Sequence, residues 1–120
     1  MPDGAVIFGG KALQPVFYAL AAEEMFPEAS VGGGRLYYCT TRGTFKDTEV
    51  PLDFVARKYA EELVTLVGGR LQTADLPAAP AKDACKWCDY RPVCGPHEER
   101  RTGRKNPDRL RDLIQLRERA

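Results

Sequence analysis

Three of the four cysteines in this 120-residue chain lie inside the short stretch 85–94. Cys85, Cys88 and Cys94 form a C-x2-C-x5-C arrangement in a loop-forming segment. A C-x2-C pair can direct two thiolates at one metal ion or cluster, and a third cysteine nearby completes three ligand positions. A disulfide framework is the alternative, but no secretory signal is visible and cytosolic thiols normally stay reduced. The spacing therefore favours an inorganic centre.

Two kinds of centre fit this spacing. His97 lies three residues beyond Cys94, so the three cysteines and this histidine could form a Cys3His zinc (Zn2+) site within the chain. Alternatively, the three cysteines are ligands of a [4Fe–4S] cluster whose fourth ligand lies elsewhere. That ligand would lie outside this chain or be Cys39, although a lone cysteine on a predicted strand is more often a small buried apolar residue. Spacing alone does not choose between zinc and iron.

The composition is that of an ordinary globular protein, with 43% apolar and 29% charged residues. No apolar run reaches the roughly 18 residues that suggest a membrane span, and no secretory leader follows Met1. We therefore expect a cytoplasmic protein without a membrane partner. Residues 1–81 carry seven basic and ten acidic side chains, whereas residues 82–120 carry eleven and seven. The basic end could contact a phosphate backbone, or it could be a solvated Arg-rich helix.

The first half of the chain reads as a helix followed by two strands. Residues 11–26 are predicted to be helical, with Pro15 in the first turn and an apolar face formed by Leu13, Phe17 and Leu20. Residues 32–34, all glycine, are interpreted as a flexible connector to strands at 35–41 and 45–50, which are joined by a hairpin turn at 42–44. The apolar run that opens the chain has no earlier element to pair with, which indicates that sequence upstream is missing.

The second half is predicted to contain two more helices. Asp53 is a candidate N-cap for a helix that ends at Gly68-Gly69 and whose shared face consists of Val55, Tyr59, Leu63 and Leu66. Residues 71–84 lack periodicity and are interpreted as an extended excursion that leads to the cysteines. A final amphipathic helix is predicted from Asn106-Pro107 onward, with a face that consists of Leu110, Leu113, Ile114 and Arg117.

Residues 9–18 resemble the Q-x-x-x-Y helix of RecB-like members of the PD-(D/E)XK nuclease superfamily, with Gln14 and Tyr18 as the motif residues. The cysteine triplet resembles that of AddB-type and CRISPR-adaptation nucleases in the same group. The resemblance implies a restriction-endonuclease-like α/β fold, here a mixed α+β C-terminal part, from a DNA-repair or recombination nuclease. It divides the chain into part of the nuclease core at residues 1–70 and a cysteine-rich iron–sulfur segment with a basic helix at residues 71–120.

In that family the metal-binding Asp and the E-x-K or D-x-K motif lie on strands just before the Q-x-x-x-Y helix. Asp3 is the only acidic residue before Gln14, and neither motif occurs in residues 1–13. Phosphodiester hydrolysis with Mg2+ or Mn2+ needs carboxylates that hold the metal. We therefore expect a fragment that is inactive alone and whose partners are DNA, the N-terminal remainder of the nuclease domain and a helicase subunit or domain.

The resemblance gives Gln14 and Tyr18 a supporting catalytic role, because residues four apart on a helix share one face. The alternative is a helix start with Tyr18 half-buried against the core. Trp87 and Tyr90 could stack on DNA bases, but shielding of the metal from water is favoured. Phosphate contacts are predicted for the basic residues Lys86, Arg91, Arg100, Arg101, Arg104 and Lys105. The alternative function is a non-enzymatic Cys3His zinc module that binds DNA or docks a protein.

Overall fold

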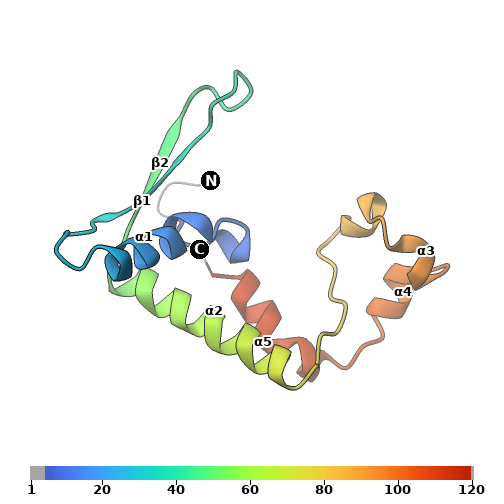
Figure 1. Ribbon diagram of the computed structural model, residues 1–120. Coiled ribbons are helices and arrows are strands. Elements are labelled where there is room, and N and C mark those ends of the chain that lie inside the picture. The colour runs from blue at the N-terminus through green and yellow to red at the C-terminus, as the bar shows by residue number, and fades with distance from the viewer. Residues whose placement is uncertain (1–4, 120) are drawn as a thin grey trace.

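The computed structural model describes residues 5–119 and combines helices with one antiparallel pair of strands. Figure 1 shows the hairpin rising from the paired helices α1 and α2, with residues 84–102 standing away from them. This mixed architecture confirms the α+β fold class predicted from the sequence. The elements in chain order are the 3-10 turn η1 (Phe8–Gly10), α1 (Gln14–Met25), β1 (Gly33–Tyr37), β2 (Asp47–Pro51), α2 (Phe54–Gln72), the 3-10 turn η2 (Ala84–Trp87), α3 (Arg91–Cys94), α4 (Glu98–Thr102) and α5 (Pro107–Arg117).

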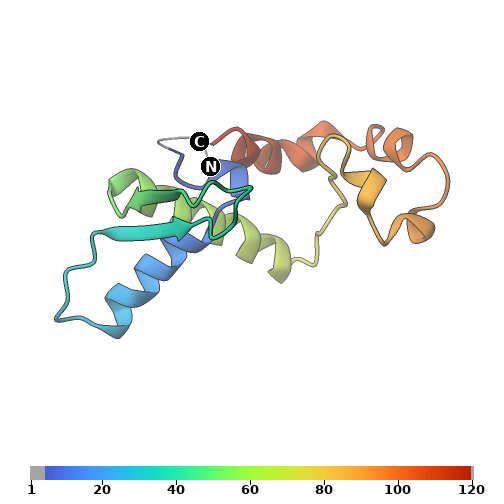
Figure 2. The same cartoon turned by 90° about the horizontal axis from the view of Figure 1, so that it is seen from above.

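The described part of the chain is elongated instead of compact. Its principal extents are 52 × 39 × 21 Å and its radius of gyration is 17.2 Å. A compact chain of this length would have a radius of gyration of about 13–14 Å. The excess comes from residues 73–106, which loop away from the end of α2 before α5 returns alongside it (Figures 1 and 2). Residues 84–102, called the cysteine segment below, therefore lie outside the main core.

Helix α1 begins three residues later than the sequence predicted. Gly9 and Gly10 have φ values of 60° and 84°, so the chain turns as η1 before the helix can start. Pro15 lies in the first turn as predicted, where its missing N–H costs no hydrogen bond. The buried face was predicted only in part, because Pro15, Val16 and Ala19 are buried whereas the predicted Leu13, Phe17 and Leu20 are half-buried.

The two strands pair as predicted, but the glycines before them are not a flexible connector. Gly33 and Gly34 are the first residues of β1, opposite Pro51 and Val50 of β2. A Cβ atom on Gly34 would lie 2.0 Å from the Pro15 carbonyl oxygen, and one on Gly33 would lie 2.3 Å from the Val50 carbonyl oxygen. The glycines thus let the backbone of β1 approach both its partner strand and the start of α1. The connection between strands spans 38–46, longer than the predicted turn.

Helix α2 starts at the predicted cap but runs past its predicted end. The Asp53 carboxylate accepts a hydrogen bond from the Ala56 N–H at 2.8 Å, which confirms the N-cap. The helix continues through Gly68 and Gly69 to Gln72 and ends where Ala74 takes a positive φ of 53°. The buried residues of this helix are Ala56, Ala60 and Leu63. Of the four residues predicted to form the buried face, Leu63 is buried, Tyr59 and Leu66 are half-buried, and Val55 is exposed.

Two apolar clusters lie along α2. The first joins α1, the hairpin and α2 through Val16, Ala19, Val50, Leu52, Ala56 and Ala60. The second joins the opening run to α2 and α5 through Ile7, Leu63 and Leu116. The opening run therefore does have partners, because Ile7 is fully buried and the Gly9 N–H donates to the Arg119 carbonyl at 2.7 Å. These partners come later in the chain, so the interpretation that an earlier element is missing stays a prediction.

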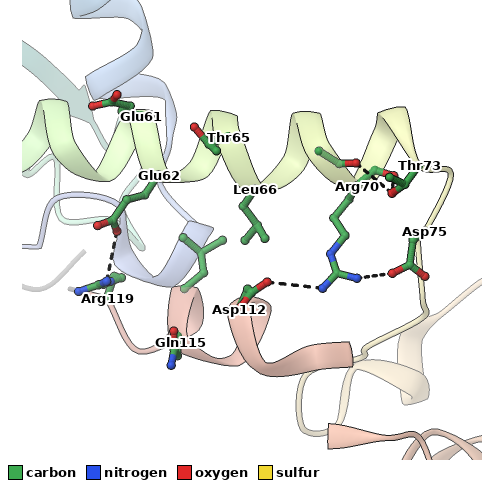
Figure 3. A pocket seen from close by; sticks show the side chains of 12 residues that line it. Glu61, Glu62, Thr65, Leu66, Arg70, Thr73, Asp75, Asp112, Gln115 and Arg119 are labelled. Carbon is green, nitrogen blue, oxygen red and sulfur yellow. Dashed lines mark hydrogen bonds and ion pairs between the residues drawn. The ribbon is translucent and has the colours of Figure 1, made fainter. Parts of the chain in front are cut away.

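Helix α5 forms where the sequence predicted it. The Asn106 side chain caps it by accepting from the Asp108 N–H at 3.0 Å. Its buried residue is Leu116, with Leu113 packed beside the second cluster, whereas the predicted Ile114 is exposed. The helix packs along α2, and a cleft of about 710 Å³ lies between them (Figure 3).

An ion-pair network closes one end of this cleft. Arg70 of α2 contacts the Asp75 carboxylate and lies 3.7 Å from a carboxylate oxygen of Asp112 on α5 (Figure 3). Arg109 of α5 also contacts Asp75. Hydrogen bonds from the guanidinium of Arg109, and then of Arg70, hold the pKa of Asp75 below its usual range. The network fastens α5 to the end of α2, where few apolar side chains are buried.

In the described part of the chain, no helix is long and apolar enough to cross a membrane.

We predict that Gly34→Ala destabilises the protein, because the new Cβ would overlap the Pro15 backbone, which cannot move aside cheaply. The free energy of unfolding should fall by about 1–3 kcal/mol in a urea titration followed by circular dichroism. Gly32→Ala is the matched control, since a Cβ there meets nothing within 4 Å. Equal stability of the two variants would contradict the close approach of β1 to α1.

Asp75→Asn should lower the melting temperature at neutral pH and weaken the loss of stability in acid. The folded pKa of Asp75 is lowered, so its contribution is present above the ordinary value of 3.8 and is lost as pH falls below it. Thermal unfolding of both proteins between pH 7 and pH ~3 measures this difference. Asp89→Asn removes the same charge from an exposed residue and should leave the pH profile unchanged. Identical profiles for all three proteins would show that the network contributes nothing.

Candidate metal and nucleic-acid site

Gln14 and Tyr18 lie one turn apart at the start of α1, and both are exposed. Tyr18 is 67% exposed, so it does not face the core as the alternative interpretation required. The opposite side of the helix carries the buried Val16 and Ala19. An amide and a phenol in this position are free to reach a phosphate or a metal-bound water. Whether they do so in catalysis stays a prediction.

The cysteine triplet is spread over two short helical turns and the loop between them. Cys85 lies in η2, Cys88 follows η2 directly, and Cys94 is the last residue of α3. All three are free thiols; Cys85 and Cys94 are half-buried and Cys88 is exposed. None of these short turns buries a hydrophobic side chain.

The surroundings of Cys85 are negatively charged. Burial raises the pKa of the Cys85 thiol, and the carboxylates of Glu98 and Glu99, followed by the other two cysteines, raise it further. Glu98 is itself only 7% exposed and is paired with Arg91 at 2.7 Å. A cation or cationic cluster would relieve this repulsion and displace the thiol proton, because metal binding requires the thiolate.

The three thiols of the cysteine triplet do not form a closed set of metal ligands. Within residues 5–119, no three His, Cys, Asp or Glu side chains are grouped closely enough to hold a metal ion. His97 is exposed and has a positive φ of 61° at the start of α4. Three soft thiolates are the donor set that an iron–sulfur cluster or zinc prefers, so the residue types fit while their present arrangement is open. The metal assignment stays a prediction.

Cys39 is placed differently from the sequence expectation. It lies two residues beyond the end of β1, and its side chain is exposed instead of being a small buried residue. Figures 1 and 2 show the hairpin connection that carries it well apart from the cysteine segment. It is therefore a poor candidate for the fourth ligand in this conformation.

The aromatic residues of the cysteine segment face solvent. Trp87 is 89% exposed, and Tyr90 and the neighbouring Val93 are also mostly exposed. In this arrangement they do not shield the thiols from water, which was the favoured interpretation of the sequence. They form an exposed apolar surface beside several cations, and such surfaces commonly mark binding sites.

Four of the six predicted phosphate-binding cations make contacts inside the protein. Lys86 pairs with Asp83 at 2.8 Å, and Arg91 with Glu98. Arg101 donates to the Cys94 carbonyl, and Lys105 donates to the Ala78 carbonyl at 2.5 Å. Arg100 and Arg104 are exposed, and their side chains have no ion pair or hydrogen bond to any residue in the range 5–119. These two are the free cations of the predicted set.

The cleft between α2 and α5 was not predicted. Its walls carry charged residues from both helices, with Glu62 and Arg119 paired at 3.2 Å toward the end opposite Arg70 (Figure 3). The contributing residues are some fifty positions apart in sequence, and the charges show no spacing that marks them as neighbours. Only the return of α5 along α2 brings them together.

Comparison with known proteins identifies the family. The search of curated proteins and the search of solved structures each found no match. A family model described as the PD-(D/E)XK nuclease superfamily matches residues 8–95. The matched region starts ahead of α1 and ends directly after Cys94, so it contains Gln14, Tyr18 and the whole cysteine triplet. This chain belongs to the PD-(D/E)XK nuclease superfamily.

Proposed function

We propose that this chain supplies the Q-x-x-x-Y helix and a cysteine-bearing, DNA-binding C-terminal segment to a RecB/AddB-like nuclease that acts in DNA repair or recombination. The observation that carries the proposal is the single family match that includes both the helix of Gln14 and Tyr18 and the three cysteines. Each motif alone is common, whereas their occurrence in this order within one matched region is specific. The expected partners are DNA, the remainder of the nuclease domain and a helicase subunit or domain.

In this proposal the reaction needs residues from outside the chain. Residues 5–13 contain no Asp or Glu, so the carboxylates that bind Mg2+ or Mn2+ come from another segment. Those metal ions would activate water and stabilise the charge that develops on the phosphate. Gln14 and Tyr18, exposed on one side of α1, would position the phosphate or the metal-bound water. The chain alone would not hydrolyse DNA.

The cysteine segment needs a stabilising centre because it buries so little apolar surface. Within residues 64–115, all of which the structure describes, no hydrophobic side chain is buried. Metal–ligand bonds can replace a core that a short segment cannot build. We therefore propose that Cys85, Cys88 and Cys94 bind a [4Fe–4S] cluster whose fourth ligand comes from outside the chain. The cluster would fasten this segment to the rest of the nuclease.

DNA binding is proposed for the outer surface of the cysteine segment and of the residues that follow it, as far as Lys105. Arg100 and Arg104 have no internal partners and can neutralise phosphates, while Lys86, Arg91, Arg101 and Lys105 also hold the segment together. The exposed ring of Trp87 adds a surface on which a base can stack. Such contacts bind DNA without regard to sequence, as expected for a nuclease that processes DNA ends.

Anaerobic reconstitution with iron, sulfide and a small thiol as fourth ligand should yield brown protein with cluster absorption. Cys88→Ser should lose most of the bound iron, because one of the three thiolates is removed. Cys39→Ser is the matched control and should retain the iron, since Cys39 lies apart from the triplet. Iron and sulfide analysis together with the absorption spectrum measure both results.

Zinc analysis of the same samples distinguishes the alternative. Colourless protein that holds zinc and loses it in His97→Ala would establish a Cys3His module in place of a cluster. Protein that binds neither iron nor zinc would overturn the metal proposal altogether.

Arg100→Ala and Arg104→Ala should each weaken binding to a labelled DNA oligonucleotide and reduce its salt dependence. Loss of one phosphate contact lowers the slope of log Kd against log salt by about 0.7–0.9. Fluorescence anisotropy at several salt concentrations gives this slope. Lys58→Ala is the control, because Lys58 lies on α2 beside Glu62 and away from the cysteine segment. If the slope does not respond to either arginine, the proposed DNA surface is wrong.

A further inference from the structure

The connection between β1 and β2, residues 38–46, forms an ordered tip on the projecting hairpin (Figure 1). The Tyr38 N–H donates to the Lys46 carbonyl at 2.8 Å, which extends the strand pairing into the tip. The Gly43 N–H donates to the Thr40 hydroxyl at 3.0 Å, and the Lys46 N–H donates to the Gly43 carbonyl at 3.2 Å. These bonds fix the path of the backbone at the tip.

Two consecutive residues at this tip have left-handed backbone conformations. Thr44 has φ 55° and Phe45 has φ 51°. Tight hairpin turns with this geometry strongly prefer Asn and Gly, and a β-branched residue such as Thr is rarely found there. The sequence thus places unfavourable residues at the turn, and such exceptions are concentrated at functional positions. The Phe45 ring at this turn is 70% exposed.

The charged residues within the tip itself are both positive. Arg42 and Lys46 are both exposed, and residues 38–46 contain no Asp or Glu. The nearest acidic residues along the chain, Asp47 and Glu49, are both bound to Arg35 on the opposite strand. Within residues 5–119, neither Arg42 nor Lys46 has a side-chain ion pair. The tip thus carries an exposed aromatic ring and two cations close to it in sequence, which are groups that suit a nucleobase and phosphates.

We propose that the hairpin tip is a DNA-binding wedge. Phe45 stacks on an unpaired base at a single-stranded or frayed DNA end, while Arg42 and Lys46 bind the flanking phosphates. This inference rests on the proposed DNA-processing function, and it adds a contact at a place separate from the cysteine segment (Figures 1 and 2). Because every base offers a π-face, the wedge recognises strand ends without regard to sequence.

Phe45→Ala in the full chain should bind a labelled single-stranded oligonucleotide about tenfold more weakly than the original protein, measured by fluorescence anisotropy. Phe54→Ala is the matched control, because Phe54 is 79% exposed at the start of α2 and should not contact DNA. Circular dichroism melts check that each variant folds. Phe45→Trp in a Trp87→Phe background makes position 45 the sole tryptophan, and its emission should be quenched when a base stacks on it.

The outcomes separate this inference from the proposal on which it rests. Equal affinity of Phe45→Ala and Phe54→Ala, or unquenched emission from tryptophan at position 45, overturns the wedge while DNA binding by the cysteine segment stands. Failure of the original protein to bind DNA at low salt overturns both.

Discussion

Helix α2 contributes to both apolar clusters, and these clusters position α1, the hairpin, the opening run and α5. Ala56 and Ala60 are small, so α1 and the hairpin can approach α2 closely on one stretch. Leu63, further along, packs with Ile7 from the start of the chain and Leu116 from its end. Beyond Leu63 no apolar side chain of the helix is fully buried; Leu66 still packs beside the second cluster, and Arg70 at the far end contacts α5 through an ion pair with Asp112. The protein is thus held by apolar burial at one end of α2 and by ion pairs at the other.

Apolar burial decreases along α2, and this decrease is the basis for the role that we propose for the cysteines. The cysteine segment leaves the main body where apolar packing has already ended, and the residues on either side of it are tied together by cations that bind backbone carbonyls. Lys105 holds the Ala78 carbonyl and Arg117 holds the Ala79 carbonyl. Exposed hydrogen bonds of this kind add little stability compared with a core. In our proposal the inorganic centre provides what packing does not, which links the cysteine spacing to the shape of the fold.

Positive charge has two separate uses in this molecule. Lys86, Arg91 and Arg101 stabilise the cysteine segment through a carboxylate or a carbonyl. Arg100 and Arg104, with Arg42 and Lys46 at the hairpin tip, are left for a partner. Counting basic residues cannot separate these uses, because the difference depends on which acceptors the fold brings near. In our proposals, the free cations lie on two surfaces and each surface carries an exposed aromatic ring.

The sequence by itself determined the local elements, since caps, prolines and alternating apolar residues act within a few positions. It correctly predicted the Asp53 and Asn106 caps, the first-turn Pro15, the paired strands and the order of motifs that the family match covers. Tertiary structure decided what depends on distant neighbours: Gly33 and Gly34 became strand residues because other backbones approach them. The structure also differs from the sequence prediction at other places. Helix α2 continues through Gly68-Gly69, Ile7 is buried, Cys39 and Trp87 are exposed, and the Arg70 network forms. The burial of Ile7 and the Arg70 network follow from contacts between residues far apart in the chain, which no local pattern encodes.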